Sequence, residues 1–317
     1  MKRIVSVVLA AMVVFTLVGC KEKLNKNLTL YKDVKISEYV EVGNYKGIEV
    51  DTSSSEFQEY FDAIYDKDVS KYGLSTVIKE GTVENGDTVN LDFEGKLNGV
   101  AFAGGTAKGY DLVIGSGAFI DDFEEELIGV KIGETKDVTA TFPTPYSNNP
   151  DLAGKEAIFT CKINYITRKQ KIEESYIKMG FKSSAEYKEE IKARAVKSYL
   201  LDIVCSSAKI KGYPTKESQL LTDALVNQAK TRFESAGIPF ETALAYDGYT
   251  VETLRQEIMA DTMKVSLATY YIVVAEELEV SQNTINSQGD GIPLVLAEMY
   301  AIEDTAMNFV YNNAKIK

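Results

Sequence analysis

The chain has 317 residues, of which 45% are hydrophobic and 26% are charged, and its formal net charge at pH 7 is −12. This composition is that of a globular protein with room for two or three domains. The acidic balance argues against nucleic-acid binding, which needs a positively charged face to neutralise phosphates. The sequence contains no histidine, which excludes Ser-His-Asp and Cys-His catalysis, histidine metal sites and imidazole acid–base chemistry.

The first residues have the pattern of an export signal. Two basic residues precede an apolar run from Ile4 to Val18, which is short for a membrane-spanning helix. The run ends in Leu17-Val18-Gly19-Cys20, which resembles a bacterial lipobox, in which the cysteine is acylated. We therefore expect a lipoprotein signal peptide over 1–19, lipidation at Cys20 and a protein anchored by lipid on the extracytoplasmic face of the cell membrane. An ordinary signal sequence that contains a cysteine is the alternative.

The next part of the chain predicts a tether and then the beginning of a folded domain. Residues 20–36 are polar and rich in lysine, without periodicity, which is typical of a tether. Over residues 37–80 the sequence predicts a short strand, Tyr45–Val50, and then a helix capped by Ser53–Glu56. The apolar stripe of that helix contains several aromatic residues, which we interpret as packing rather than binding residues.

From residue 81 to residue 168 the hydrophobic period becomes two. Residues 88–95 alternate cleanly between apolar and polar, and Asn98-Gly99 is a strong hairpin signal. A single short helix is expected over 121–128, where acidic residues stand at the positive end of the helix dipole. These acids also raise the alternative of a cation site, but helix-start electrostatics explains them; they are Asp121, Asp122, Glu124, Glu125 and Glu126. The prediction is a small antiparallel sheet wrapped around one short helix.

The remaining residues, 169–317, are helical in pattern. Apolar residues recur at spacings of three and four over Glu186–Lys209, Thr215–Ser235, Val251–Glu279 and Pro293–Ala314. We expect an all-α domain of long helical arms, which makes the whole protein an α+β fold. Core packing is the default interpretation of the stripes, and an apolar surface left open for a client polypeptide is the alternative.

Two cysteines follow Cys20. Cys161 shares a strand face with Phe159 and Ile163, and Cys205 lies in an apolar helical segment. Neither has the electropositive neighbourhood of a reactive thiol. We interpret both as small buried hydrophobic residues, with a disulfide between them as the alternative.

The sheet segment resembles an FKBP-type peptidyl-prolyl isomerase domain, and specifically the form found in the trigger factor family. Seven motifs carry the resemblance, in order along the chain: Gly86-Asp87-Thr88-Val89, Asp92-Phe93-Glu94-Gly95, Phe102-Ala103-Gly104-Gly105, Leu112 to Gly117, Phe119 to Glu124, Gly129 to Glu134, and Phe142 to Tyr146 with Leu152 to Lys155. The helical remainder is similar to the C-terminal chaperone arms of that family. Tyr45–Val50 is similar to the end of its first domain.

The resemblance implies a pocket for an X-Pro bond and needs no cofactor and no metal. The residues that would line it are Phe93, Phe102, Tyr110, Phe119, Ile120, Phe123, Tyr146 and Phe159. Among them Ile120 would donate its backbone N–H to the carbonyl on the proline side, and Tyr146 would be a second polar partner. Two departures stand out: Ala103 replaces the acidic residue usual in the family, and the ribosome-docking loop has no counterpart.

These features together predict a membrane-anchored foldase that isomerises X-Pro bonds and binds unfolded or newly exported polypeptides, without docking on ribosomes. Ala103 favours an alternative, a chaperone whose isomerase fold is catalytically silent. A lipoprotein that serves one dedicated assembly partner is a third interpretation.

Overall fold

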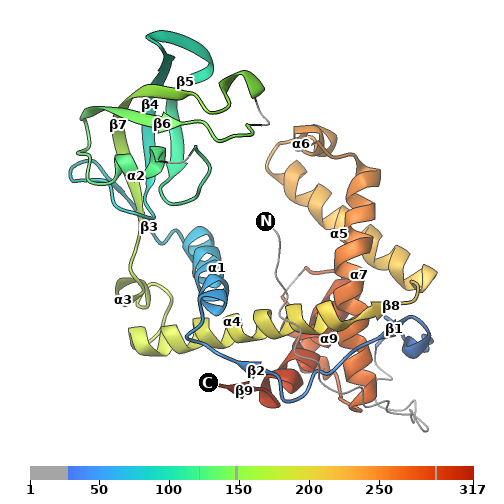
Figure 1. The fold of residues 1–317 in the computed structure, drawn as a ribbon. Helices are drawn as coiled ribbons and strands as arrows, with labels where there is room; N and C mark the ends of the chain where they lie inside the picture. Colours follow the sequence, from blue (N-terminus) through green and yellow to red (C-terminus); the bar gives the residue numbers. More distant parts are fainter. Residues whose placement is uncertain (1–27, 121, 147–148, 247, 290) are drawn as a thin grey trace. The chain divides into compact units, whose positions relative to one another are not determined.

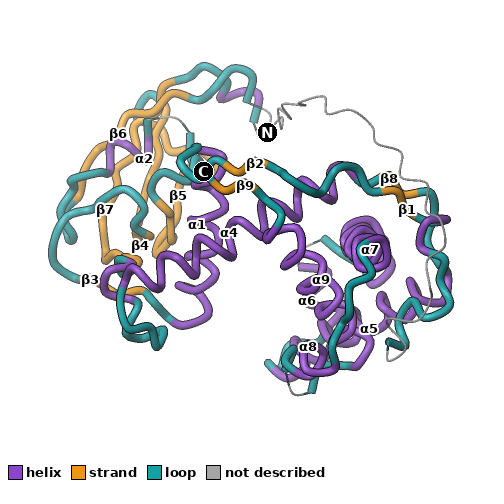
Figure 2. Tube along the Cα trace, turned by 90° about the horizontal axis from the view of Figure 1, so that it is seen from below, coloured by secondary structure: helices purple, strands orange, loops and turns teal. Residues whose placement is uncertain are grey.

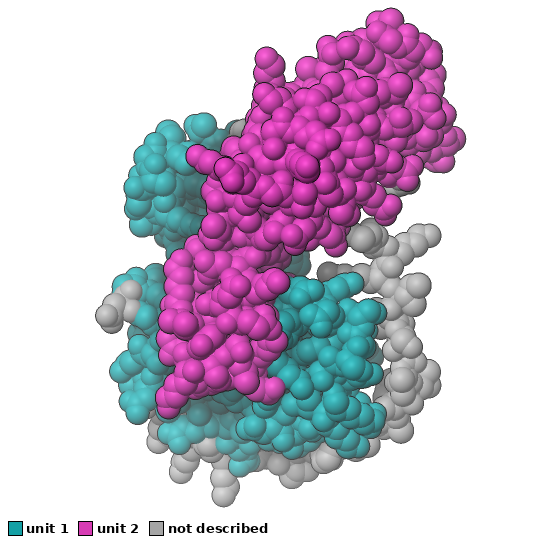
Figure 3. Space-filling model, turned by 90° about the vertical axis from the view of Figure 1, so that its left-hand side faces the viewer, with its two compact units in different colours: residues 1–62, 192–317 teal, residues 63–191 magenta. Residues whose placement is uncertain are grey.

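The computed structural model describes residues 28–317 except 121, 147, 148, 247 and 290. The predicted signal peptide and Cys20 therefore lie outside the described residues. The described residues form two compact units (Figures 1 and 3), which we call the sheet unit, residues 63–191, and the helical unit, residues 28–62 with 192–317. The boundary between them falls inside two helices, α1 (Ser55–Tyr72) and α4 (Ser184–Ser207).

The sheet unit contains one antiparallel sheet and two short α-helices, one between β5 and β6 and one after β7, besides the parts of α1 and α4 that fall in it. Its strands run in the order β3-β7-β4-β5, and β6 pairs with the first half of β7. The elements are β3 (Ser75–Ile78), β4 (Thr88–Leu97), β5 (Val100–Val113), α2 (Phe123–Leu127), β6 (Thr135–Thr141), the 3-10 turn Pro150–Leu152, β7 (Glu156–Lys169) and α3 (Ile172–Ser175).

The alternating sequence of the strands decides which side of this sheet forms the core. Along β7 the residues Ala157, Phe159, Cys161 and Ile163 are buried, as the period of two predicts. The turn between β4 and β5 has positive φ at both Asn98 (51°) and Gly99 (82°), the geometry that an Asn-Gly hairpin requires. Helix α2 contacts β6 (Figure 1), so the expected sheet with one short helix is present.

The helical unit is built mainly from four long helices. Its elements are the 3-10 turn Ile36–Glu38, β1 (Val40–Glu41), β2 (Glu49–Val50), β8 (Lys209–Ile210), α5 (Thr215–Ser235), α6 (Phe240–Tyr246), α7 (Val251–Ala275), α8 (Gln282–Asn286), α9 (Leu294–Asn312) and β9 (Lys315–Ile316), besides the parts of α1 and α4 that it contains. Helix α7 packs on α9 and α5. Among the described helices, α7 alone has the length and apolar composition of a membrane span, and 44% of that window is buried inside the structure.

Residues 28–50, which we call the N-terminal strap, bind along the helical unit. The expected tether over 20–36 is wrong for its described part, because Leu28, Leu30 and Tyr31 are fully buried. Two two-stranded pairings hold the rest of the strap: β1 is antiparallel to β8, and β2 is parallel to β9 (Figure 2). The apolar residues of this stretch are too few and too irregularly spaced to show a period, so the sequence did not indicate that they are buried.

The division of the chain also differs from the expected one. Residues 37–80 do not form one segment, because they are split between the two units, and residues 169–191 belong to the sheet unit. Contacts of α1 explain this: the Tyr65 hydroxyl hydrogen bonds with Ser175, and the Tyr187 hydroxyl donates to the buried carboxylate of Asp68 at 2.8 Å. Long-range side-chain contacts of this kind leave no periodic signal in the sequence.

Candidate active site

Three strands, helix α2 and two loops of the sheet unit bring the predicted pocket residues together. Phe93 lies on β4, Phe102 and Tyr110 on β5, and Phe159 on β7. The loop before α2 carries Phe119 and Ile120, α2 begins with Phe123, and Tyr146 follows β6. Seven of these eight residues belong to the core cluster of this unit or pack against it. The eighth, Tyr110, contacts the rings of Phe93 and Phe119.

The rings form one continuous chain of edge contacts. Phe93 is at its centre, with its ring centroid 5.4 Å from that of Phe119, 6.2 Å from that of Phe123 and 6.4 Å from that of Phe159, at interplanar angles of 88°, 77° and 64°. Phe102 extends the chain on the other side, 5.9 Å from Phe159. Perpendicular packing places ring edges against ring faces, which is the favoured geometry and produces a stiff apolar wall.

The rings of the cluster differ in burial. Phe93, Phe123 and Phe159 are buried, whereas Phe102, Phe119, Ile120 and Tyr146 are only partly buried. Tyr110 is 42% exposed. The inner rings therefore form the floor of an apolar site, and the others form a rim that solvent reaches.

Three residues of the site were not among the predicted lining residues. The ring of Phe142 lies 5.8 Å from that of Phe102 and 5.0 Å from that of Tyr146, so it joins Tyr146 to the cluster. A Cβ added at Gly95 would meet Phe159 at 2.5 Å and Phe102 at 2.9 Å, and one added at Gly105 would meet Phe102 at 2.7 Å. The two glycines thus leave the space that the Phe102 ring occupies. Both glycines belong to the motifs that resemble the family, and this was the only sign in the sequence that they adjoin the site.

The loop before α2 is held by a carboxylate. Glu124, on the first turn of α2, is 7% exposed and accepts hydrogen bonds from the backbone N–H groups of Gly115 (2.8 Å), Gly117 (3.2 Å) and Phe119 (3.1 Å). Burial by itself would raise the pKa of this carboxyl group, but the three backbone N–H groups and the Ser116 hydroxyl together lower it. The helix-start interpretation of the acids therefore missed the role of Glu124, which is to close the loop.

Ala103 itself has no carboxylate, and Asp92, an acidic residue of β4, is engaged in other hydrogen bonds. Asp92 precedes Phe93 and therefore faces the other side of the strand. Its carboxylate accepts hydrogen bonds from the Gly109 N–H at 2.8 Å and the Asn164 amide at 3.0 Å, which lower its pKa in that order.

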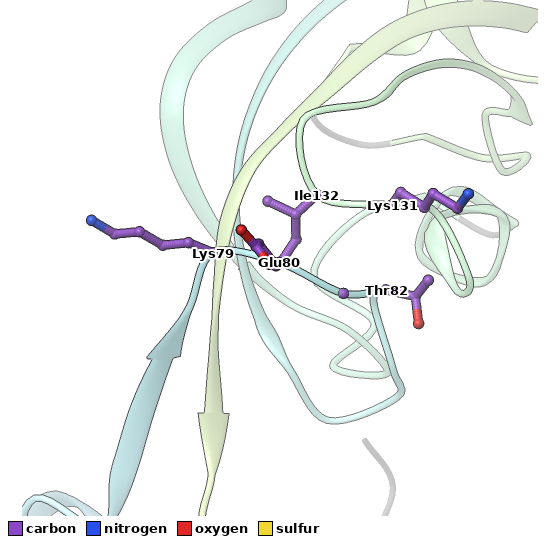
Figure 4. A pocket seen from close by; sticks show the side chains of 6 residues that line it. Lys79, Glu80, Thr82, Lys131 and Ile132 are labelled. Carbon is purple, nitrogen blue, oxygen red and sulfur yellow. The ribbon is translucent and has the colours of Figure 1, made fainter.

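Two open hollows of the sheet unit are lined by none of the ring residues. One, of about 350 Å³, is bordered by Asp122, Glu125, Glu126 and Thr139. The other, of about 330 Å³, lies beside Lys79 and Lys131, whose side chains point in opposite directions (Figure 4). Within the described residues, no group of three or more acidic or cysteine side chains is arranged to hold a metal ion.

Both described cysteines are free thiols. Burial raises the pKa of Cys161 to about 12 and that of Cys205 to about 11, so neither is a nucleophile at neutral pH. The interpretation as buried hydrophobic residues is confirmed for Cys161, whereas Cys205 is partly exposed.

Comparison with known proteins gives the family. Residues 79–164 match the family FKBP-type peptidyl-prolyl cis-trans isomerase. The trigger factor of Macrococcus caseolyticus (strain JCSC5402) is 34% identical over 283 residues, which cover 83% of this chain and 66% of that protein. That of Staphylococcus saprophyticus is 35% identical over 282 residues, 83% of this chain and 64% of the relative. The chain is a trigger factor homologue with an FKBP-type isomerase domain.

This trigger factor homologue spans just under two thirds of the length of the curated relatives that it matches. A solved structure titled "Promiscuous Substrate Recognition in Folding and Assembly Activities of the Trigger Factor Chaperone" aligns with 86% of the chain and 72% of its own, at 16% identity and a TM-score of 0.26.

The comparison corrects the expected localisation. A lipid-anchored protein on the extracytoplasmic face of the membrane is wrong for this homologue, because its relatives are trigger factors, which are cytoplasmic chaperones without a membrane anchor.

Proposed function

We propose that this trigger factor homologue catalyses cis–trans isomerisation of X-Pro bonds in unfolded polypeptides and binds such polypeptides as a chaperone. One observation carries the catalytic part: the predicted pocket residues, from separate segments of the chain, meet in one aromatic cluster that has buried inner rings and partly exposed outer residues. Trigger factor relatives over most of the chain support the combination of the two activities.

Bond rotation needs no nucleophile, and the site offers none. The barrier of about 18–20 kcal/mol arises from amide resonance, and the twisted transition state has lost much of the charge separation of the planar amide. An apolar, water-poor site therefore favours the twisted form over the planar ground state. The rings of Phe93, Phe123 and Phe159 form such a floor for the proline, and the backbone N–H of Ile120 at the rim would bind the carbonyl.

The chaperone part is supported by apolar surface in the helical unit. Phe240 and Leu244 of α6 pack on α5 around Val226, and several apolar residues of α5 and α7 against them are only partly buried. Ile238 and Tyr249 flank α6 and are 43% and 37% exposed. Exposed apolar side chains grouped around a small cluster are the type of surface that an unfolded chain binds.

The test of catalysis is exchange NMR of an X-Pro peptide with the full chain. We expect the wild-type protein to accelerate cis–trans exchange and the Phe102→Ala, Phe159→Ala double variant to lose this effect, while Val100→Ala, at the 70% exposed hairpin tip, retains it. A folded wild-type protein that binds unfolded chains without accelerating exchange would instead establish the silent chaperone, which Ala103 favours.

Chaperone binding has its own test. We expect the wild-type chain to suppress aggregation of a chemically denatured protein on dilution, and Ile238→Asp to weaken this suppression, since it places a charge on the exposed apolar surface. The absence of ribosome docking stays a prediction. It is tested by sedimenting ribosomes with the full chain, which we expect to remain in the supernatant.

A further inference from the structure

The loop that presents Phe119 and Ile120 depends on one side chain that takes no part in bond rotation. Both carboxylate oxygens of Glu124 are used: Oε2 accepts from the N–H groups of Gly115 and Gly117, and Oε1 accepts from the N–H of Phe119 and the hydroxyl of Ser116 at 3.2 Å. All four donors belong to five consecutive residues. The loop therefore folds around this carboxylate.

The same contacts divide the backbone N–H groups of the loop into two sets. The N–H of Phe119 is bound to Glu124, whereas the next N–H, that of Ile120, has no acceptor among the residues that the structure describes. Only the φ and ψ angles of Phe119 separate these two amides. Fixing the first amide therefore restricts the direction of the second, which is the donor that the proposed function assigns to the carbonyl of the X-Pro bond.

We propose that Glu124 is a positioning residue of the isomerase site, which aims the Ile120 N–H and holds the Phe119 ring in the aromatic wall. This inference rests on the proposed function. A carboxylate suits the task because hydrogen bonds to a charged acceptor are about twice as strong as neutral ones. Its burial increases the need for these partners, since a buried charge without them is strongly disfavoured.

The neighbouring residues provide matched controls. Glu125 stands next to Glu124 on the same turn of α2 but is exposed, so Glu125→Gln removes the same charge without touching the loop. Glu124→Gln keeps the shape but has one acceptor oxygen in place of two, and its amide nitrogen is a donor that faces other donors. Ser116→Ala is a milder variant that leaves the three N–H contacts of Glu124; it removes the hydroxyl contact to Glu124 and the hydrogen bond that this hydroxyl accepts from the Ala118 N–H at 3.3 Å.

The experiment measures exchange NMR of the peptide Ala-Leu-Pro-Phe at several concentrations with the full chain and each variant. For Glu124→Gln we expect kcat to fall by about tenfold or more, with KM changed less than about threefold, because the apolar floor that binds proline is intact. Ser116→Ala should lose about two- to threefold in kcat, and Glu125→Gln should match the wild type. In amide spectra the peptide should shift the Ile120 signal in the wild type and much less in Glu124→Gln.

The outcomes separate this inference from the proposed function. An active wild type with Glu124→Gln equally active, or one whose activity falls only in proportion to its folded fraction, overturns the positioning role and leaves the isomerase intact. A wild type that does not accelerate exchange overturns both. If Glu124→Gln does not fold, Ser116→Ala decides: a lowered kcat with an unchanged KM supports the role, and wild-type kinetics refute it.

Discussion

The two units of this protein differ in how far apart along the chain their stabilising contacts lie. In the sheet unit, β4 pairs with β5 through a two-residue turn, and the whole aromatic site comes from residues 93–159. In the helical unit, the strap and α9 meet although Thr29 and Glu298 are 269 residues apart. The first unit is therefore specified by local pattern, and the second depends on contacts between the two ends of the chain.

The largest effect should come from the carboxylate that holds the strap. Glu298 is 1% exposed and accepts hydrogen bonds from the Thr29 N–H (2.9 Å), the Thr29 hydroxyl (2.9 Å) and the Leu30 N–H (2.7 Å). Glu298→Ala leaves the buried Leu30 N–H without an acceptor and also removes both hydrogen bonds of the exposed Thr29, so we expect a loss of about 2–4 kcal/mol in the stability of the helical unit. Hydrogen exchange by mass spectrometry should show faster exchange in α7 and α9 and an unchanged sheet.

Glu257→Ala is the control for this prediction, because Glu257 is exposed on α7 and should change stability very little. If Glu298→Ala exchanged like Glu257→Ala, the strap would not be a stabilising part of the helical unit.

A glycine in each unit sharpens the comparison further. Gly95→Ala places a Cβ 2.5 Å from the Phe159 ring, and the overpacking should cost about 1–3 kcal/mol in the sheet unit and displace the site rings. Gly212→Ala, whose Cβ would lie 3.9 Å from Tyr39, should be tolerated. Urea unfolding and the exchange assay measure the two effects. Equal stability and activity of the two variants would contradict the close approach at Gly95.

Acid should weaken the sheet unit through Glu124. The pKa of this carboxyl is lowered in the folded state, so its contribution is present above the unfolded pKa of 4.5 and is lost as the pH falls through the lower folded value. Urea unfolding at about pH 7 and about pH 3.5 should show a smaller loss in Glu124→Gln than in the wild type. The same loss in both would show that other carboxylates dominate.

The smallest effect is expected at a tyrosine of the strap. The Tyr31 hydroxyl and Ser266 are hydrogen bonded at 2.8 Å, and burial raises the pKa of Tyr31 well above its usual value. Tyr31→Phe removes this bond, and we expect a loss of about 1 kcal/mol in the helical unit. Tyr110→Phe, at an exposed ring of the sheet unit, is the matched variant and should be neutral in stability. The midpoints of thermal unfolding of the two variants, each against the wild type, measure the two effects.

The sequence predicted the sheet unit well because its signals are local. The alternation in 88–95 and the Asn98-Gly99 turn predicted β4 and the turn that follows it, and the helix expected over Thr215–Ser235 has those bounds. The sequence analysis missed two features near the site: the contact of the Phe142 ring with Tyr146, and the hydrogen bonds that Glu124 accepts from the loop Gly115–Phe119. Both depend on side-chain direction, which spacing along the chain does not give.

By itself, the sequence determined the class of the protein, because hydrophobic periods of two and of three to four residues mark strands and helices wherever they occur. It also predicted which residues would line the site, through the motifs that resemble the family, and the structure brings their side chains together. Only the tertiary structure decided that Leu28, Leu30 and Tyr31 are core residues, because their burial depends on α7 and α9, more than two hundred residues away. It likewise decided which N–H groups of the Gly115–Ile120 loop are bound by Glu124 and which one remains at the rim of the site.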